Sequence, residues 1–232
     1  AYNFISFVPG IASLDVLTDA SGYSVVIVGD STVANDLPEY FGQAIYQQDN
    51  IDNVGIVGKG LVGNRLLGNG LGLGTQIDGN SLLARFERDV LSQSGVEYVI
   101  VKVGANDIIY PVSHDAIAAD PGIKQATADE IIDGYRTLIK KCHDKDVKII
   151  FASITQWKGT TRDYFDSGAQ YVRTEEEFQA DWQIAKEVNE WLATTDEHDG
   201  YVDLTEVSAN PLDKDALLPE YTTDGIHPTE AC

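Results

Sequence analysis

Short apolar runs alternate with longer amphipathic segments along this chain. The run VVIV at residues 25–28 has no polar position among its β-branched residues, which is typical of a strand covered on both faces. The segments between such runs carry apolar residues at helical spacing. The pattern predicts strands at residues 24–28, 51–57, 97–103, 147–152 and 200–204, and helices at residues 37–47, 81–91, 127–142 and 174–192.

Two of the predicted helices begin with a capping box. Thr127 and Thr174 are each followed three residues later by a glutamate, so the two residues of each pair can satisfy each other's backbone amides. Strands that alternate with helices favour βαβ units. We therefore expect a single α/β domain over residues 1–232, in three layers around a parallel sheet of about five strands, with a leading segment at residues 1–22.

Glycines crowd residues 55–79, a density that predicts irregular structure. Residues 58–63 read GKGLVG and match the dinucleotide fingerprint GxGxxG. That fingerprint belongs at the turn after a first strand, with an acidic residue about 20 positions further on, whereas this match follows the second predicted strand. Nucleotide binding is therefore the weaker explanation. Glycine also lets a backbone N–H approach a reacting oxygen closely.

Acidic residues far outnumber basic ones, and the formal net charge is -21. The 16 basic residues are scattered, with one tight pair at Lys140 and Lys141, so a nucleic acid or an anionic membrane surface would be repelled. We expect no nucleic-acid partner, and the acidity is better explained by a solubilising surface than by an acidic binding site. No apolar run approaches the roughly 20 residues of a membrane span.

The ends and the cysteines bear on compartment. The chain lacks a recognisable signal peptide and any Met, which indicates a processed product or a piece of a longer one. We expect a secreted, extracellular protein, with the cytoplasm as the alternative.

Two cysteines cannot form a disulfide framework, and Cys142 falls on the apolar side of a predicted helix while Cys232 ends the sequence. Free thiols are expected, with a bridge as the alternative.

Polar turns follow the predicted strands at residues 24–28 and 97–103. The first turn holds Ser31 and the second holds Asn106. Ligands of parallel α/β sheets bind beyond the carboxyl ends of the strands, so both side chains are site candidates. Alternatively, Ser31 caps the next helix and Asn106 is a turn residue. Loops at residues 110–126 and 157–173 follow two strands on the same side.

Near the end of the sequence, DGIHP places Asp224 three residues before His227. At this spacing the carboxylate can hold one ring nitrogen protonated, which leaves the other nitrogen free to accept a proton. A serine hydroxyl is a weak nucleophile until an adjacent base takes its proton, so His227 supplies what Ser31 lacks. The histidines are dispersed and neither CxxC nor HExxH occurs, so we expect no metal and no cofactor.

Four blocks of this sequence resemble those of the SGNH hydrolases, also called GDSL esterases and lipases, and occur in that family's order. They are GDST at residues 29–32, GLVGNRLL at 60–67, GAND at 104–107 and DGIHP at 224–228. The resemblance extends over LLARFERDVL at residues 82–91 and the helix at 175–192.

The resemblance implies a flavodoxin-like α/β/α sandwich and a serine ester hydrolase acting through an acyl-enzyme. Its implied catalytic residues are Ser31, Asp224 and His227. The implied oxyanion hole comprises the amides of Ser31 and Gly63 and the side chain of Asn106. After Ser31 the chain reads TVAND where relatives commonly keep a glycine. Relatives also continue past the DGIHP block into a final helix. We therefore expect that helix to be truncated in this sequence.

Short acyl esters, especially acetyl groups on carbohydrates, are the expected substrates by family habit. Three aromatic loop residues, Tyr110, Trp157 and Tyr164, could stack on a sugar, with local loop packing as the alternative. A lipase for long-chain esters and a non-catalytic carbohydrate-binding relative stay open as alternatives.

Overall fold

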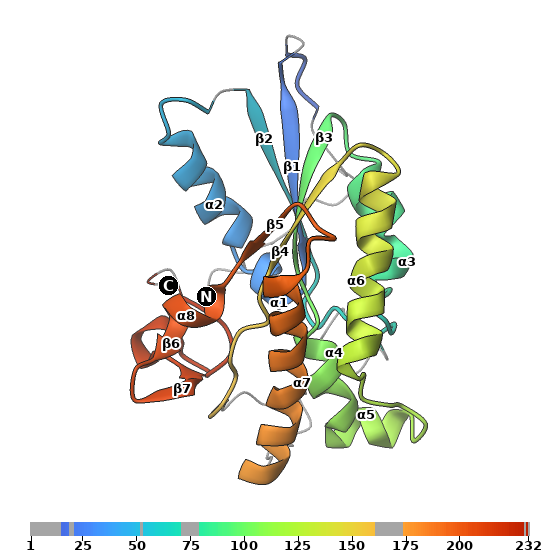
Figure 1. The fold of residues 1–232 in the computed structure, drawn as a ribbon, viewed down its shortest axis with the longest axis vertical. Coiled ribbons are helices and arrows are strands. Elements are labelled where there is room, and N and C mark those ends of the chain that lie inside the picture. The colour runs from blue at the N-terminus through green and yellow to red at the C-terminus, as the bar shows by residue number, and fades with distance from the viewer. Residues whose placement is uncertain are drawn as a thin grey trace, which may run out of the picture.

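A five-stranded parallel sheet lies at the centre of the computed structural model, which describes residues 15–18, 21–51, 53–70, 79–160, 174–229 and 231. The strand order β2-β1-β3-β4-β5 is that of flavodoxin-like folds. Helices cover both faces, which confirms the predicted three-layer sandwich (Figure 1). The strands are β1 (Tyr23–Gly29), β2 (Val54–Gly60), β3 (Val96–Lys102), β4 (Lys148–Ala152) and β5 (Gly200–Val202).

The central strand β1 is buried on both faces, as its unbroken apolar run predicts. Val26 and Val28 belong to the large core under α3, α6 and α7, whereas Val25 and Ile27 pack against the side that α2 covers. Hydrogen bonds to β2 on one side and β3 on the other hold β1 in the middle of the sheet. The pairing with β3 continues into the residue after β1, because the amide of Asp30 donates a hydrogen bond to the carbonyl of Lys102.

Four predicted helices are present. They are α2 (Leu37–Tyr46), α3 (Leu82–Phe86) with a following π-helical turn at Glu87–Leu91, α6 (Ala128–His143) and α7 (Glu175–Thr194). Both capping boxes form: the hydroxyls of Thr127 and Thr174 accept hydrogen bonds from the amides of Glu130 and Glu177, and the carboxylates of these glutamates accept hydrogen bonds from the amides of the two threonines. Within the described ranges, no helix is long and apolar enough to cross a membrane.

Residues 55–57 lie in β2 as the predicted strand at 51–57 requires, but the expectation that glycines disrupt regular structure is wrong for residues 58–60, which also lie within β2. A Cβ on Gly60 would lie 2.2 Å from the amide nitrogen of Ala34, and one on Gly58 would lie 2.8 Å from a ring carbon of Pro38. Glycine therefore lets the first helices pack directly on this edge strand. The GxGxxG match begins inside a strand rather than at a strand-to-helix turn, so it lacks the context of a dinucleotide site. Residues 71–78 of the glycine-rich stretch lie outside the described residues.

Several short elements carry no periodic signal and were not predicted. One turn or two of helix contains too few residues to display a 3.6-residue repeat. The elements are α1 (Ser31–Ala34), α4 (Ala105–Ile109), a 3₁₀ turn at Tyr110–Val112, α5 (His114–Ala119), α8 (Leu204–Ser208), a hairpin of β6 (Ala209–Asn210) and β7 (Asp213–Leu217), and a 3₁₀ turn at Pro219–Tyr221.

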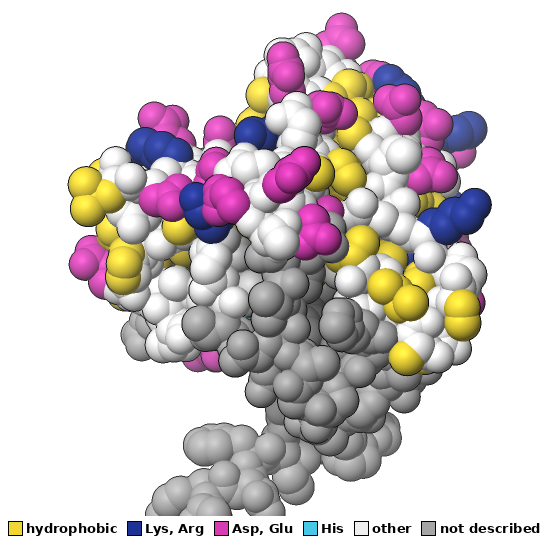
Figure 2. Space-filling view, turned by 90° about the horizontal axis from the view of Figure 1, so that it is seen from below, with side chains coloured by type: hydrophobic (Ala, Val, Ile, Leu, Met, Phe, Trp, Pro, Cys, Tyr) yellow, Lys and Arg dark blue, Asp and Glu magenta, His cyan; other side chains and the backbone are white. Residues whose placement is uncertain are grey.

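Acidic side chains spread over the described surface. On the face in Figure 2, basic side chains stand among acidic ones and do not gather into one basic patch. Cys142 is a free thiol on the buried face of α6, and burial raises its pKa to about 12. Cys232 and most of the leading segment lie outside the described residues.

Candidate active site

Ser31 follows the carboxyl end of β1 and is the first residue of α1. The helix cap is its neighbour Asp30, whose Oδ1 accepts a 3.0 Å hydrogen bond from the amide of Thr32. Ser31 is only 7% exposed, and its hydroxyl is not used in capping. The capping role considered for this turn therefore belongs to Asp30, which leaves the Ser31 hydroxyl available for chemistry.

A chain of two short hydrogen bonds links Ser31 to the far end of the sequence. Ser31 Oγ lies 2.7 Å from Nε2 of His227, and Nδ1 of the same ring lies 2.7 Å from Oδ2 of Asp224. Burial alone would raise the pKa of Asp224, but hydrogen bonds from the His227 ring and from the amides of His227 and Ile226 hold that pKa below its ordinary value. A carboxylate in this position keeps Nδ1 protonated and Nε2 free to accept the serine proton.

The turn that carries this pair is held in place by the loop at residue 160 and by the Thr222 hydroxyl. Gly225 has φ +84°, and a Cβ there would lie 2.7 Å from the Cα of Thr160, so only glycine fits. Thr160 Oγ1 donates a 2.9 Å hydrogen bond to the carbonyl of Asp224, and Thr222 Oγ1 accepts one of 2.9 Å from the amide of Gly225. The loop at residue 160 thereby positions the carboxylate and imidazole.

The segments at residues 60–67 and 104–107, called the glycine block and the asparagine block, meet beside the end of β1. Gly63 is buried with φ +74°, and Asn106 Nδ2 donates a 3.2 Å hydrogen bond to the carbonyl of Asn64. Within the described ranges, the amides of Ser31 and Gly63 have no acceptor. Unpaired donors at the carboxyl end of a sheet can stabilise a developing oxyanion. Their role as oxyanion donors stays a prediction.

Asp107 ends the asparagine block, and its role in the site was not predicted from the sequence. Its buried carboxylate accepts hydrogen bonds from the amides of Leu66 at 2.7 Å and Leu67 at 3.0 Å. Burial raises its pKa to about 6, although those amides and the Arg65 guanidinium at 3.9 Å act in the opposite direction. Asp107 therefore ties the glycine block to the end of β3. In the sequence, the only sign of this role is that an acidic residue directly follows Asn106.

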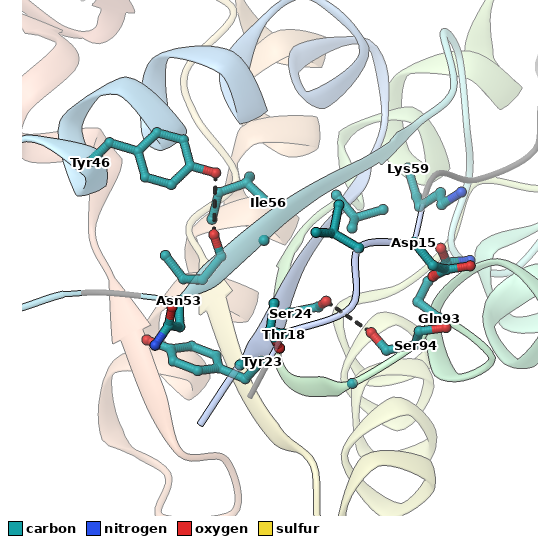
Figure 3. Close-up of a pocket in the computed structure, with 16 residues that line it drawn as sticks. Asp15, Thr18, Tyr23, Ser24, Tyr46, Asn53, Ile56, Lys59, Gln93 and Ser94 are labelled. Atoms are coloured by element: carbon teal, nitrogen blue, oxygen red, sulfur yellow. Dashed lines mark hydrogen bonds between the residues drawn. The ribbon is translucent and has the colours of Figure 1, made fainter. Parts of the chain in front are cut away.

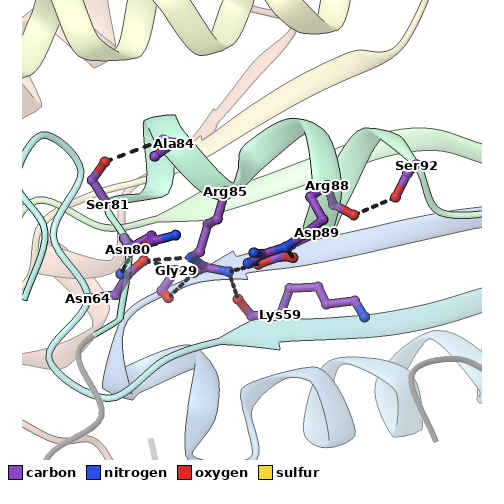
Figure 4. Close-up of polar contacts among 10 residues, drawn as sticks. All are labelled: Gly29, Lys59, Asn64, Asn80, Ser81, Ala84, Arg85, Arg88, Asp89 and Ser92. Carbon is purple, nitrogen blue, oxygen red and sulfur yellow. Dashed lines mark hydrogen bonds and ion pairs between the residues drawn. The ribbon is translucent and has the colours of Figure 1, made fainter.

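Arg85 is a second residue whose role beside the site was not predicted from the sequence. This 2% exposed side chain donates hydrogen bonds to the carbonyls of Gly29 at 3.1 Å and Lys59 at 3.0 Å and to Asn64 Oδ1 at 3.0 and 2.8 Å (Figure 4). It also lies 3.4 Å from Asp89. A single guanidinium thus joins the ends of β1 and β2 to the glycine block. An arginine among the apolar positions of LLARF was the only sequence signal.

Burial argues against the sugar-stacking role predicted for Tyr110 and Trp157. Tyr110 is 1% and Trp157 0% exposed, and the Trp157 ring packs edge-on against Phe178 and Trp182, with centroids 6.0 and 5.1 Å away. Neither ring offers a face to a sugar in this structure, which favours the packing alternative. Tyr164 lies outside the described residues.

A hollow of about 520 Å³ lies at the other end of the strands, where β1 and β2 begin (Figure 3). In it Tyr46 Oη donates to the carbonyl of Val54 at 3.3 Å, and Ser24 Oγ donates to that of Ser94 at 2.9 Å. These hydrogen bonds link α2 to β2 and link β1 to the segment before β3. Because ligands of such sheets bind beyond the carboxyl ends, this hollow is separate from the site at Ser31.

The fold and the hydrogen-bonded serine, histidine and aspartate define a class of α/β/α hydrolases. Residues 17–232 match the profile of the GDSL-like Lipase/Acylhydrolase family. The chain belongs to this family and is a carboxylic ester hydrolase. No protein with a curated description matches it.

Solved structures support the same fold. A protein from Bacteroides fragilis NCTC 9343, provisionally described as an acylhydrolase, aligns with TM-score 0.60 at 20% identity, over 92% of this chain and 82% of that one. The acetyl xylan esterase AlAXEase aligns with TM-score 0.57 at 20% identity, over 90% and 92%. A mutant of Axe2, an acetyl-xylooligosaccharide esterase from Geobacillus Stearmophilus, aligns with TM-score 0.56 at 19% identity, over 91% and 89%. At these identities the likeness shows the fold alone.

Proposed function

We propose that Ser31 is the nucleophile of this ester hydrolase, with His227 as its general base and Asp224 as the residue that orients the imidazole. The two 2.7 Å contacts that join these side chains are the observation that carries the proposal. Nucleophile and base within hydrogen-bonding reach, with a third group that orients the base, is the arrangement that activates a serine.

The reaction takes two symmetrical steps. Ser31 Oγ attacks the ester carbonyl while Nε2 of His227 takes its proton. The resulting tetrahedral oxyanion then collapses, and the imidazolium gives that proton to the leaving alcohol. Water next attacks the acyl group on Ser31 with His227 again as base. The acid is released and the serine restored. Asp224, whose pKa lies below its ordinary value, stays ionised and stabilises the imidazolium in both steps.

The oxyanion is assigned to three donors: the amides of Ser31 and Gly63 and the side chain of Asn106. Both amides lack acceptors within the described ranges, so they are available for a substrate oxygen. Asn106 Nδ2 uses one hydrogen on the carbonyl of Asn64 and has a second to give. Neutral donors of this kind stabilise developing charge without becoming charged themselves.

Short acyl esters, acetyl above all, are the proposed substrates, with a carbohydrate as the proposed alcohol. Support comes from the acetyl xylan and acetyl-xylooligosaccharide esterases that share the fold. Tyr110 and Trp157, two of the three residues predicted to stack on a sugar, are buried and give the carbohydrate no support. The acyl group is therefore the better supported half of this proposal.

Three measurements test the proposal. Ser31→Ala is expected to fold and to lose hydrolysis of p-nitrophenyl acetate, and retained turnover would refute the nucleophile. A series from acetate to dodecanoate is expected to show kcat/KM falling with acyl length, whereas a clear preference for long chains would favour a lipase. Binding of xylo-oligosaccharides without any ester turnover would favour the non-catalytic alternative.

A further inference from the structure

One buried cation differs from the others in the described part of the chain. Three basic residues are buried there: Arg65, Arg85 and Lys102. The two arginines lie 3.9 Å from Asp107 and 3.4 Å from Asp89, respectively. Lys102 is 4% exposed, yet among the described residues no carboxylate lies within 4.0 Å of its ammonium. Burial of a charge without a counter-ion is costly, so this lysine calls for an explanation.

The known partners of Lys102 are hydroxyl groups. Its Nζ donates to Oγ1 of Thr32 at 3.2 Å and to Oγ1 of Thr155 at 3.4 Å. An ammonium has three hydrogens, and the third finds no acceptor in the described ranges. Neutral hydroxyls orient the ammonium but do not balance its charge.

The Lys102 side chain lines a cavity of about 500 Å³. The cavity is bounded by α1, the beginning of α2, α8 and the end of β7, and apolar side chains such as Leu37, Leu204 and Leu217 form much of its wall. The lining contains one carboxylate, Asp36, which is exposed and more than 4.0 Å from the Lys102 ammonium. A single cation in a largely apolar cavity favours an anionic group on an otherwise apolar ligand.

The cavity adjoins the reacting residues. Thr32 and Pro228, which line it, are the neighbours in sequence of Ser31 and His227. This adjacency is the reason for assigning a ligand group beside Lys102 to a molecule whose ester reaches Ser31.

We propose that this cavity binds a carboxylate carried by the ester substrate, with Lys102 as its counter-ion. One ammonium balances one negative charge. A phosphate carries nearly two charges at neutral pH, and the second would be unbalanced in a chain of net charge -21. The carboxylate stands either on the acyl group, as in a half-ester of a dicarboxylic acid, or on the alcohol. Turnover of such esters rests on the proposed function, whereas binding of the carboxylate does not.

Substrate pairs that differ in one carboxylate test the proposal and its two forms. For the acyl side, mono-p-nitrophenyl glutarate is compared with p-nitrophenyl butyrate. For the alcohol side, p-acetoxybenzoate is compared with its methyl ester. In Lys102→Met the kcat/KM ratio of acidic to neutral ester is expected to fall by roughly 10- to 100-fold in one pair, because a charge-assisted contact is lost. Lys186→Met, a change at an exposed lysine of α7, is expected to leave both ratios as in the wild type.

Binding is measured separately in Ser31→Ala, which cannot turn over substrate. Calorimetry is expected to show saturable binding of whichever acidic ester responded, together with its loss in Ser31→Ala/Lys102→Met. If the wild type hydrolyses no ester, the proposed function fails, and this titration with both acidic esters still decides the cavity. Equal binding by the two forms would overturn the role of Lys102.

A surface substitution avoids any loss of folding from the change at Lys102. Val207 is 65% exposed and lines the cavity, so Val207→Glu places a negative charge at its opening, and Val207→Gln is the neutral match. The acidic-to-neutral kcat/KM ratio is expected to be roughly 3-fold lower in Val207→Glu than in Val207→Gln at low ionic strength. Unchanged ratios in both the Val207 and the Lys102 variants would overturn the proposal.

Discussion

The carboxylate of Asp107 accepts a 2.7 Å hydrogen bond from the amide of Leu66, which lies 41 residues earlier in the chain. The glycine block has no regular structure of its own after Leu61, so contacts of this kind determine where its backbone lies. Asp107 is wholly buried and follows Asn106 directly. One helical turn thus presents the amide side chain of Asn106 and also fastens the loop that carries Gly63.

Burial of Asp107 should make stability depend on pH. Its pKa rises from 3.8 to about 6 on folding, so the folded chain binds the proton more tightly and its stability falls as pH rises through that window. Between about pH 4 and pH 7 the free energy of unfolding of the wild type should fall relative to that of Asp107→Asn by up to the order of 3 kcal/mol. Urea denaturation of both proteins across this range measures the difference, in which effects of the other acidic residues cancel. Parallel curves would contradict the raised pKa.

Arg85 should be worth far more than a surface arginine. Arg85→Met removes the donors to the carbonyls of Gly29 and Lys59 and to Asn64 Oδ1, and buried acceptors left unpaired should cost about 3 kcal/mol or more in the free energy of unfolding. Arg88→Met is the matched control, because Arg88 is 69% exposed and pairs with Asp89 at the surface. That change should leave the free energy of unfolding nearly unchanged, because an exposed ion pair contributes little to stability. Denaturant unfolding compares the two, and equal losses would contradict the role of Arg85.

Long periodic segments were predictable from the sequence, and short or contact-determined ones were not. The run at residues 25–28 and the capping boxes at Thr127 and Thr174 specify their structure locally, and the structure confirms them. The irregular structure predicted at Gly58 and Gly60 was wrong, because these glycines allow Pro38 and Ala34 to pack closely on β2. The sequence does not show that these residues are neighbours in the fold.

The residues of the candidate site also fall into two groups: those that the sequence reveals and those that only the fold reveals. The sequence predicts Ser31, Asp224 and His227 as site candidates because the chemistry of each side chain and its place after a strand or in a turn are visible there, and the structure joins the three by hydrogen bonds. Arg85 acts through backbone carbonyls, which any sequence has, so nothing in its neighbours reveals the contact. Lys102 sits in an apolar strand where a charge is unusual, but only the fold shows the cavity beside it.

Asn106 should affect turnover more than substrate binding. If its side chain stabilises the oxyanion, Asn106→Ala should lower kcat by roughly 10²- to 10³-fold with little change in KM. Because Asn106 also donates to the carbonyl of Asn64, the free energy of unfolding is measured alongside the kinetics. Asn106→Asp, which keeps the shape but replaces the donor by an acceptor, should be at least as inactive. A variant with normal kcat would remove Asn106 from the oxyanion hole.

Gly225 offers a test of how sensitive the reaction is to the position of its base. Gly225 and Gly159 both have positive φ, at +84° and +78°, so alanine at either position should lower the free energy of unfolding by about 1 kcal/mol or more. Only at Gly225 does the added Cβ collide with a neighbour, 2.7 Å from Thr160 Cα, whereas nothing lies within 4 Å at Gly159. Gly225→Ala should therefore displace the turn of Asp224 and His227 and lower kcat/KM by roughly 10²-fold, since shifts near 1 Å have effects of that size. Gly159→Ala should keep its kcat/KM. Kinetics of both variants on p-nitrophenyl acetate, each checked for folding, compare them, and equal kcat/KM values would show that the turn absorbs the collision.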